Sequence, residues 1–221
     1  MLEIACFNPS SVLAASRSGA DRIEFCANYS LGGITPSLNA LRNLRAEIPI
    51  PIYIMIRPRG GDFVYSDAEF NRMKSDIEAF KAAGADGFVF GILDHGRGVD
   101  AGRNRELVEL ARPTQCTFHR AIDLVENLEG AVEIVVGCGF AAILTSGGQE
   151  NAVQGASVVA GLQRRFGERI GFILGGGVRA ENAGELEGRT GVGWLHSAAI
   201  TGEAENVNEE EIRRIREALK S

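Results

Sequence analysis

Charged side chains and histidines gather in a few short segments, each of which follows an apolar run. Glu24, His119 and Asp123 are the groups in these segments that could exchange protons. A carboxyl group or an imidazole can act as general acid or base when neighbouring charges move its pKa toward the working pH. We expect Glu24 or His119 to be the acid or base, and Asp123 to orient His119 or Arg120.

Other residues in these segments could hold an anion. The glycine triplet 175–177 precedes a predicted helix that begins at Val178 and Arg179. The exposed N–H groups of a helix start attract anions, although a glycine triplet is equally typical of a tight turn. The candidate anion-binding residues are Arg57, Arg59, Asp62, Arg120, Ser146, Gly147, Gly175, Gly176, Gly177, His196 and Ser197.

Metal binding is a third chemistry that the sequence allows. Cys26, His119, His196 and Glu24 could meet in space, and thiolate with imidazole suits Cu(I) or Zn(II). No CxxC or HExxH spacing is present, so such a site would depend on tertiary structure alone. Simple packing is the alternative for Cys26. It is the expectation for the other cysteines, Cys6, Cys116 and Cys138.

Short β-rich runs alternate with helical patterns along the whole chain, which predicts a parallel sheet. The predicted strands cover residues 2–6, 22–26, 52–56, 87–90, 116–118, 142–144, 170–174 and 193–195. The predicted helices cover residues 9–19, 37–47, 67–83, 101–112, 127–137, 153–166, 179–188 and 208–220.

Eight βα units in 221 residues are the number that a small (β/α)8 TIM-type barrel needs, so we predict an α/β fold with one domain over residues 1–221. A glycine before a strand recurs at Gly19, Gly84, Gly139 and Gly191, which marks pairs of units. The first three suit helix C-terminal positions with left-handed backbone. An open doubly wound sheet is the alternative. In a barrel, the segments after all the strands meet at one end.

Strand alternation indicates which side chains face the barrel axis. It places Glu24, Cys26 and His119 inside, and their apolar neighbours against the helices. A buried carboxylate needs partners. The available partners for Glu24 in this arrangement are Arg57, Arg59 and Arg120. A Glu–Arg network that only fills the barrel core is the alternative to a binding site.

Composition narrows the class of partner. Hydrophobic residues make up 45% of the chain and charged residues 24%, an ordinary globular mixture. The net charge of −6 disfavours nucleic acid. No apolar stretch reaches the roughly 20 residues of a membrane span, and the N-terminus does not resemble a signal peptide. We therefore expect a cytoplasmic protein with free thiols.

Several long motifs resemble the copper homeostasis protein CutC family from Leu2 to about Ala198. They are GADRIEFC, GGITPS, MIRPRGGDFVYSD, FHRAID, LTSGG, GGGVRAEN and LHSAA. The resemblance implies a TIM-type barrel, a cytoplasmic homo-oligomer (dimer or tetramer), a link to copper and no agreed enzymatic activity. It also implies copper ligation by cysteines near the ends of the first two strands.

The resemblance carries over to Cys26 as the second of these cysteines. Family members commonly have the first cysteine at the position of Ala5, whereas this chain has Cys6 one residue later. Because strand faces alternate, we expect Cys6 to point toward the helices, away from Cys26.

Two functions therefore remain open. The first is the binding and handling of copper, as Cu(I), in the cytosol. The alternative is a barrel enzyme of unassigned reaction that acts on a small anionic or phosphorylated metabolite at the C-terminal end of the barrel. The sequence does not decide whether the protein is an enzyme.

Overall fold

The computed structural model describes residues 1–202 and 204–220, and its centre is a closed barrel of parallel strands. Each strand pairs with the next along the chain, and the last pairs with the first, so the open doubly wound sheet is excluded. The strands are β1 Leu2–Cys6, β2 Arg22–Phe25, β3 Ile52–Met55, β4 Gly87–Phe90, β5 Gln115–Phe118, β6 Ala142–Thr145, β7 Gly171–Leu174 and β8 Trp194–Ser197.

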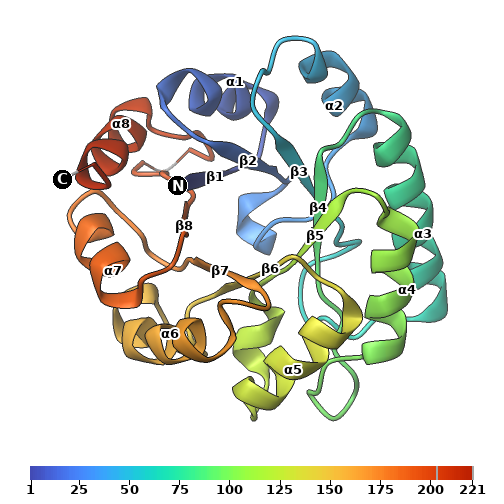
Figure 1. The fold of residues 1–221 in the computed structure, drawn as a ribbon. Helices are drawn as coiled ribbons and strands as arrows, with labels where there is room; N and C mark the ends of the chain where they lie inside the picture. The colour runs from blue at the N-terminus through green and yellow to red at the C-terminus, as the bar shows by residue number, and fades with distance from the viewer. Residues whose placement is uncertain (203, 221) are drawn as a thin grey trace.

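The helices form a ring outside the strands (Figure 1). They are α1 Pro9–Ser18, α2 Leu38–Arg45, α3 Asp67–Ala82, α4 Ala101–Ala111, α5 Leu128–Cys138, α6 Ala152–Phe166, α7 Ala183–Thr190 and α8 Glu209–Ala218, with short 3-10 turns η1 Tyr29–Leu31 and η2 Arg120–Leu124. Eight strands alternating with eight helices make a (β/α)8 TIM barrel, as the sequence predicts.

Two predicted boundaries near the end of the chain are wrong. The helix expected from residue 179 begins at Ala183, because residues 180–182 form a turn in which Asn182 accepts a hydrogen bond from the Arg179 N–H. Strand β8 continues to Ser197, so His196 and Ser197 lie within it instead of after it. No helix therefore begins directly after Gly177, and the N–H groups of the first turn of α7 lie further along the chain.

Local signals explain where the other helices begin and end. In α3, the Ser66 side chain accepts from the Glu69 N–H while the Glu69 carboxylate accepts from the Ser66 N–H, a complete capping box. Gly19 and Gly139 end α1 and α5 in the left-handed conformation that favours glycine.

Two separate apolar layers stabilise the barrel. The large one lies between strands and helices and includes Ile23, Phe25 and Cys6. The small one lies inside the barrel and contains Cys26, Tyr53, Met55 and Val89, with Phe7 packed against it. These two layers confirm the predicted strand alternation, including the outward direction of Cys6.

Large side chains close the lower part of the barrel interior. The Arg22 guanidinium carbon lies 4.2 Å from the ring centroids of both Tyr53 and Trp194. Gly87 gives the Tyr53 ring its room, because a Cβ there would lie 2.5 Å from a ring carbon. The Arg22 guanidinium is therefore held between two aromatic rings inside the barrel.

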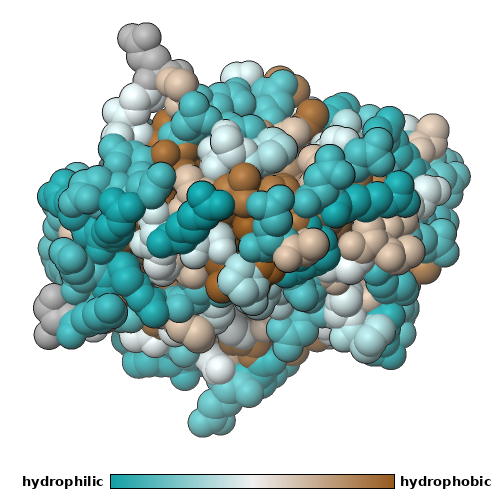
Figure 2. All heavy atoms as spheres, turned by 90° about the horizontal axis from the view of Figure 1, so that it is seen from above, coloured by the Kyte–Doolittle hydropathy of each residue, from teal (hydrophilic) through white to brown (hydrophobic). Residues whose placement is uncertain are grey.

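The side of the molecule seen in Figure 2 is largely hydrophilic, with hydrophobic atoms showing mainly in a central patch between polar side chains. Within residues 1–202 and 204–220, none of the helices has the length and hydropathy that a membrane span requires.

Candidate functional site

A cavity of ≈ 250 Å³ opens at the end of the barrel where the strands finish, which we call the mouth pocket. Turn η1, which follows β2, projects over the centre of the ring in Figure 1 and contributes Tyr29 to the wall. The lining residues are Ala5, Phe7, Glu24, Tyr29, Gly32, Met55, Arg57, Phe63, His119, Arg120, Leu144, Gly176, Gly177, Arg179, His196, Ser197 and Ala198.

The structure brings one group of the predicted site residues together on this pocket and leaves the rest outside its lining. The group on the pocket is Glu24, Arg57, His119, Arg120, Gly176, Gly177, His196 and Ser197. The predicted residues that do not line it are Arg59, Asp62, Asp123, Ser146, Gly147, Gly175 and Cys26. The residues of this group come from five strands, β2, β3, β5, β7 and β8, or from the segments directly after them.

Glu24 is buried, and its expected arginine partners are wrong. Its Oε1 accepts only from the Cys26 thiol at 3.4 Å, and its Oε2 has no partner among the described residues. Burial raises the pKa of Glu24, and the nearby Glu3 adds to this effect while His196 opposes it. The arginines are unavailable because they bind backbone carbonyls or other carboxylates, as described below.

The carboxylate that pairs inside the barrel is Glu3 of β1. It accepts from Arg22 Nε at 2.5 Å and lies 2.7 Å from Nδ1 of His196. Burial alone would raise the pKa of Glu3, but Arg22 and His196 outweigh it and lower that pKa. Burial would lower the pKa of His196, but Glu24 and Glu3 outweigh it and raise it.

Sequence reasoning missed Glu3, although a signal was present. Glu3 is a lone charge in the middle of the apolar run Leu2–Cys6, and alternation puts it on the inner face with Ala5. Register then places it beside Arg22 on one side and His196 on the other.

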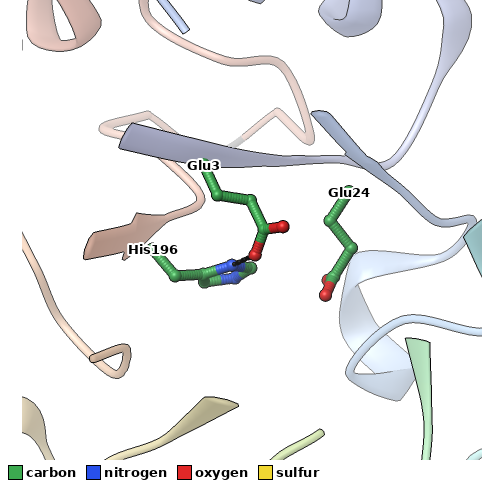
Figure 3. A group of neighbouring side chains, drawn as sticks. All are labelled: Glu3, Glu24 and His196. Carbon is green, nitrogen blue, oxygen red and sulfur yellow. Dashed lines mark hydrogen bonds and ion pairs between the residues drawn. The ribbon is translucent and has the colours of Figure 1, made fainter. Parts of the chain in front are cut away.

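Glu3, Glu24 and His196 form a cluster whose ligand atoms all lie within 4.8 Å of one another. Figure 3 shows the Glu3 carboxylate against the imidazole, with the Glu24 carboxylate directed toward the same space. A cation there would compete with the Arg22 guanidinium, which already forms an ion pair with the Glu3 carboxylate. We therefore interpret the cluster primarily as a hydrogen-bonded network of carboxyl groups and an imidazole, and only secondarily as a metal site.

His119 is held neutral at the inner end of η2. Burial, and then the Arg57 charge, lower its pKa to about 3. Its Nδ1 accepts from the Ala121 N–H at 3.4 Å, which leaves the proton on Nε2. Nε2 is buried and has no partner among the described residues. A neutral imidazole at this position can donate to a ligand but carries no charge.

Arg57 is buried and bonded to backbone instead of to a carboxylate. Its guanidinium donates to four carbonyls, those of Leu31, Gly32, Gly33 and Gly61. Its charge lies 4.6 Å from the Phe63 ring centroid, and the same ring packs 4.7 Å from the His119 ring. Arg57 therefore fixes the segments after β2 and β3 around the pocket.

Asp123 is the centre of a polar network beside the pocket. It accepts from Arg120 Nε at 2.8 Å, from Thr145, and from the Ser146 N–H and hydroxyl. Asp123 does orient Arg120, one of the two roles expected for it, but no hydrogen bond joins it to His119 among the described residues. Ser146, expected to bind an anion, already uses its N–H and hydroxyl within the chain.

Arg59 and Asp62 lie outside the mouth pocket. The Arg59 guanidinium pairs with Asp62 at 2.9 Å and with Glu69 at 2.6 Å. It also donates to the Val64 carbonyl, so this arginine stabilises the segment after β3 and the start of α3.

The glycines after β6 and β7 are mostly structural. The Gly147 N–H donates to Thr145, and the Gly175 N–H donates to the Thr145 carbonyl. Gly176 has φ +100°, and a Cβ there would lie 3.3 Å from Arg120 Nη1. Only Gly176 and Gly177 of the triplet line the pocket.

The cysteines are free, and only Cys26 lies inside the barrel. Burial and the neighbouring Glu24 raise its pKa well above the usual value for a thiol. The β2–β3 register pairs Phe25 with Ile54, so Cys26 and Met55 follow side by side and share the inner layer. Sequence reasoning did not single out Met55, because a buried methionine is usually packing.

Comparisons with known proteins point to one family. A family model described as the CutC family matches residues 1–201. A family protein CutC from Mesorhizobium japonicum is 40% identical over 201 residues, 90% of this chain and 78% of the relative. A copper homeostasis protein cutC homolog from Homo sapiens is 39% identical over 199 residues, 90% of this chain and 73% of the relative.

Solved structures agree with this match. A crystal structure named for the copper homeostasis protein CutC of Streptococcus agalactiae has a TM-score of 0.86 and 30% identity, and the match covers 91% of this chain and 99% of that one. Thiamine phosphate pyrophosphorylase from Pyrococcus furiosus has a TM-score of 0.67 at 17% identity, covering 99% of this chain and 95% of that one. The second likeness concerns the fold alone.

Proposed function

Because the chain belongs to the CutC family, we propose that it takes part in copper handling by binding Cu(I) at the barrel mouth. The family match supports copper as the cargo, since one relative is named for copper homeostasis. The observation that carries the site is the pair of sulfur side chains, Cys26 and Met55, next to each other on the inner face of β2 and β3.

Sulfur donors suit Cu(I), because thiolate and thioether are soft ligands. Cys26 supplies a thiol and Met55, which lines the mouth pocket, supplies a thioether. Copper must displace the proton of Cys26, and burial beside Glu24 makes that displacement costly. The site therefore favours an ion with high affinity for sulfur over a hard cation.

Cys6 does not belong to this site. It packs in the outer apolar layer, and its thiol faces the Ile4 carbonyl at 3.8 Å. Ala5, its neighbour on the inner face, has no donor atom. The resemblance implies a site with two cysteines, and we propose that one cysteine and one methionine take its place in this chain.

A competitive titration with Cu(I) and a chromophoric chelator, without oxygen, tests the proposal. We expect Cys26→Ser and Met55→Leu each to weaken Cu(I) binding at least tenfold. Cys138→Ser is the matched control, because that thiol lies at the end of α5 and contacts the Ala101 carbonyl. Binding of wild-type strength in Cys26→Ser would contradict the proposal.

We place this function in the cytoplasm. The four cysteines are all free in the structure, as expected in a reducing compartment. The resemblance noted from the sequence also supports a homo-oligomer, which sedimentation analysis of the purified chain would test.

A further inference from the structure

The mouth pocket retains positive charge in an acidic protein. Arg57 and Arg179 both line it, and neither has a carboxylate partner among the described residues. Arg179 donates to the carbonyls of Val178 and Ile200 and to the Ser197 hydroxyl. The chain as a whole carries a net charge of −6. A largely buried guanidinium without a counter-ion is unfavourable, so this charge requires an explanation.

A buried donor and a buried acceptor of pocket-lining residues have no partner within residues 1–202 and 204–220. They are His119 Nε2 and Glu24 Oε2, and each of these residues is 4% exposed. Buried polar atoms are normally hydrogen-bonded, so the two indicate a missing partner. The first is a donor, because His119 carries its proton on Nε2. The second belongs to a carboxyl group that can accept.

These two features define the chemistry of the occupant. Its acceptor atoms should be negatively charged, because the pocket is lined by two arginines without a carboxylate partner and by the neutral His119. It should also offer a hydroxyl donor toward Glu24. Water could satisfy the hydrogen bonds but not the charge. A cavity of ≈ 250 Å³ limits it to a small molecule, and Phe7, Phe63 and Leu144 supply apolar walls for its carbon atoms.

We propose that the mouth pocket binds a small hydroxylated organic anion, a carboxylate or a phosphate ester, with its charged group held by Arg57, Arg179 and His119. This inference goes beyond copper, because it concerns different atoms of the same opening. Cys26 directly follows β2 and Met55 is the last residue of β3, whereas the anion is held from the segments after β3, β5 and β7. Arg120 adds a further guanidinium, which Asp123 partly neutralises.

Isothermal titration of metal-free protein with glycolate and with glycerol 3-phosphate tests this proposal. Glycerol is the neutral control, and sodium chloride at equal ionic strength is the salt control. We expect at least one anion to bind with one site per chain and to raise the melting temperature, since a ligand of the native state stabilises it by mass action. Binding of glycolate alone identifies a carboxylate ligand, and binding of glycerol 3-phosphate alone a phosphate ester.

Substitutions separate this site from nonspecific attraction. We expect Arg179→Gln to weaken binding at least tenfold. His119→Phe keeps a ring but removes the Nε2 donor, and should have a similar effect if Arg179→Gln disturbs folding. Arg165→Gln is the matched control, because Arg165 is exposed on α6 and pairs with Glu129. It should bind within twofold of the wild type.

Two results would overturn the proposal: no binding of either anion beyond the salt control, or an equal loss in Arg165→Gln and Arg179→Gln. Cys26→Ser distinguishes the two proposals of this work. It should lose Cu(I) and keep the anion, so failure of one site does not imply failure of the other.

Discussion

At the scale of single residues, the barrel interior is organised by buried charges whose partners are fixed by register. The Glu3 carboxylate pairs with both Arg22 and His196. One oxygen of Glu24 accepts from the Cys26 thiol, and the other has no partner among the described residues. His119 has the opposite environment, since burial and Arg57 keep it neutral. The same pocket thus contains one imidazole whose pKa is lowered by burial and one whose pKa is raised by neighbouring carboxylates.

Acid should destabilise the protein through His119. The pKa of His119 is about 3 in the folded state and near 6.5 in the unfolded state. Between these pH values the unfolded chain binds a proton at His119 and the folded chain does not, so acid favours unfolding. The contribution of neutral His119 to the free energy of unfolding is complete above pH 6.5 and is lost as the pH falls toward 3. Between pH 7 and pH 4 we expect the free energy of unfolding of wild type to fall about 3 kcal/mol more than that of His119→Gln.

Urea unfolding at several pH values measures this difference. His95→Gln is the matched control, because His95 is an exposed histidine. It should follow the wild-type pH dependence. Parallel curves for wild type and His119→Gln would show that His119 is not held neutral.

Removal of Glu3 should be severe. Glu3→Ala leaves the buried Arg22 without its carboxylate, which costs about 3–5 kcal/mol in comparable cases. Because the loss comes from an unpaired charge, the double variant Glu3→Ala with Arg22→Met should recover part of the stability. Chemical denaturation measures all three. A double variant less stable than Glu3→Ala would contradict this explanation.

At the scale of elements, close contacts between loops and helices position the pocket walls. The segment after β6 reaches α6 so closely that a Cβ on Gly155 would lie 1.7 Å from the Ser146 carbonyl oxygen. Ser146 in turn holds Asp123 and Arg120. A Cβ placed in the same way on Gly137, in α5, would meet no neighbouring atom within 4 Å.

These two helical glycines should therefore respond in opposite ways to alanine. Gly155→Ala should destabilise by about 1–3 kcal/mol, because the backbone of the loop has to move. Gly137→Ala should stabilise by about 0.5–1 kcal/mol, the ordinary advantage of alanine over glycine in a helix. Thermal unfolding of both variants provides the comparison. Equal effects of the two substitutions would mean that the close approach at Gly155 is unimportant.

Most elements were predictable from the sequence because local signals mark them. The capping box at Ser66 and the glycines after α1 and α5 fix boundaries through short-range chemistry. The start of α7 was not predictable in this way, because the turn over residues 180–182 precedes it and the Asn182 side chain accepts from the Arg179 N–H in that turn instead of capping the helix.

The convergence of the site was also predictable, but its pairings were not. Alternation correctly placed Glu24 and His119 on the pocket. The predicted partners of Glu24 were wrong, because Arg57 donates to backbone carbonyls and Arg59 pairs with Asp62 and Glu69. Such choices depend on loop conformation, which no periodicity encodes.

At the scale of the whole molecule, the closed barrel makes every strand depend on its neighbours. Each strand pairs on both sides, so there is no free edge at which part of the barrel could separate. The outer apolar layer contains residues from nearly every strand and helix and is continuous around the barrel. This continuity among the described residues supports the proposal of a single domain over residues 1–221.

Unfolding should therefore occur in one cooperative step. Trp194 is the single tryptophan and lies against Arg22 inside the barrel, so its fluorescence reports the interior. We expect its transition in urea to coincide with the loss of helical circular dichroism from the outer ring. A tryptophan transition at clearly lower urea concentration would show that the interior opens before the helices unfold.

The central claim is that sulfur from Cys26 and Met55 binds Cu(I) at the barrel mouth. X-ray absorption at the copper edge, on protein loaded with one Cu(I) per chain, tests it most directly. The account predicts sulfur in the first coordination sphere of wild type, and fewer sulfur ligands in both Met55→Leu and Cys26→Ser. A copper sphere of nitrogen and oxygen alone in the wild type would contradict the claim and point instead to Glu3, Glu24 and His196.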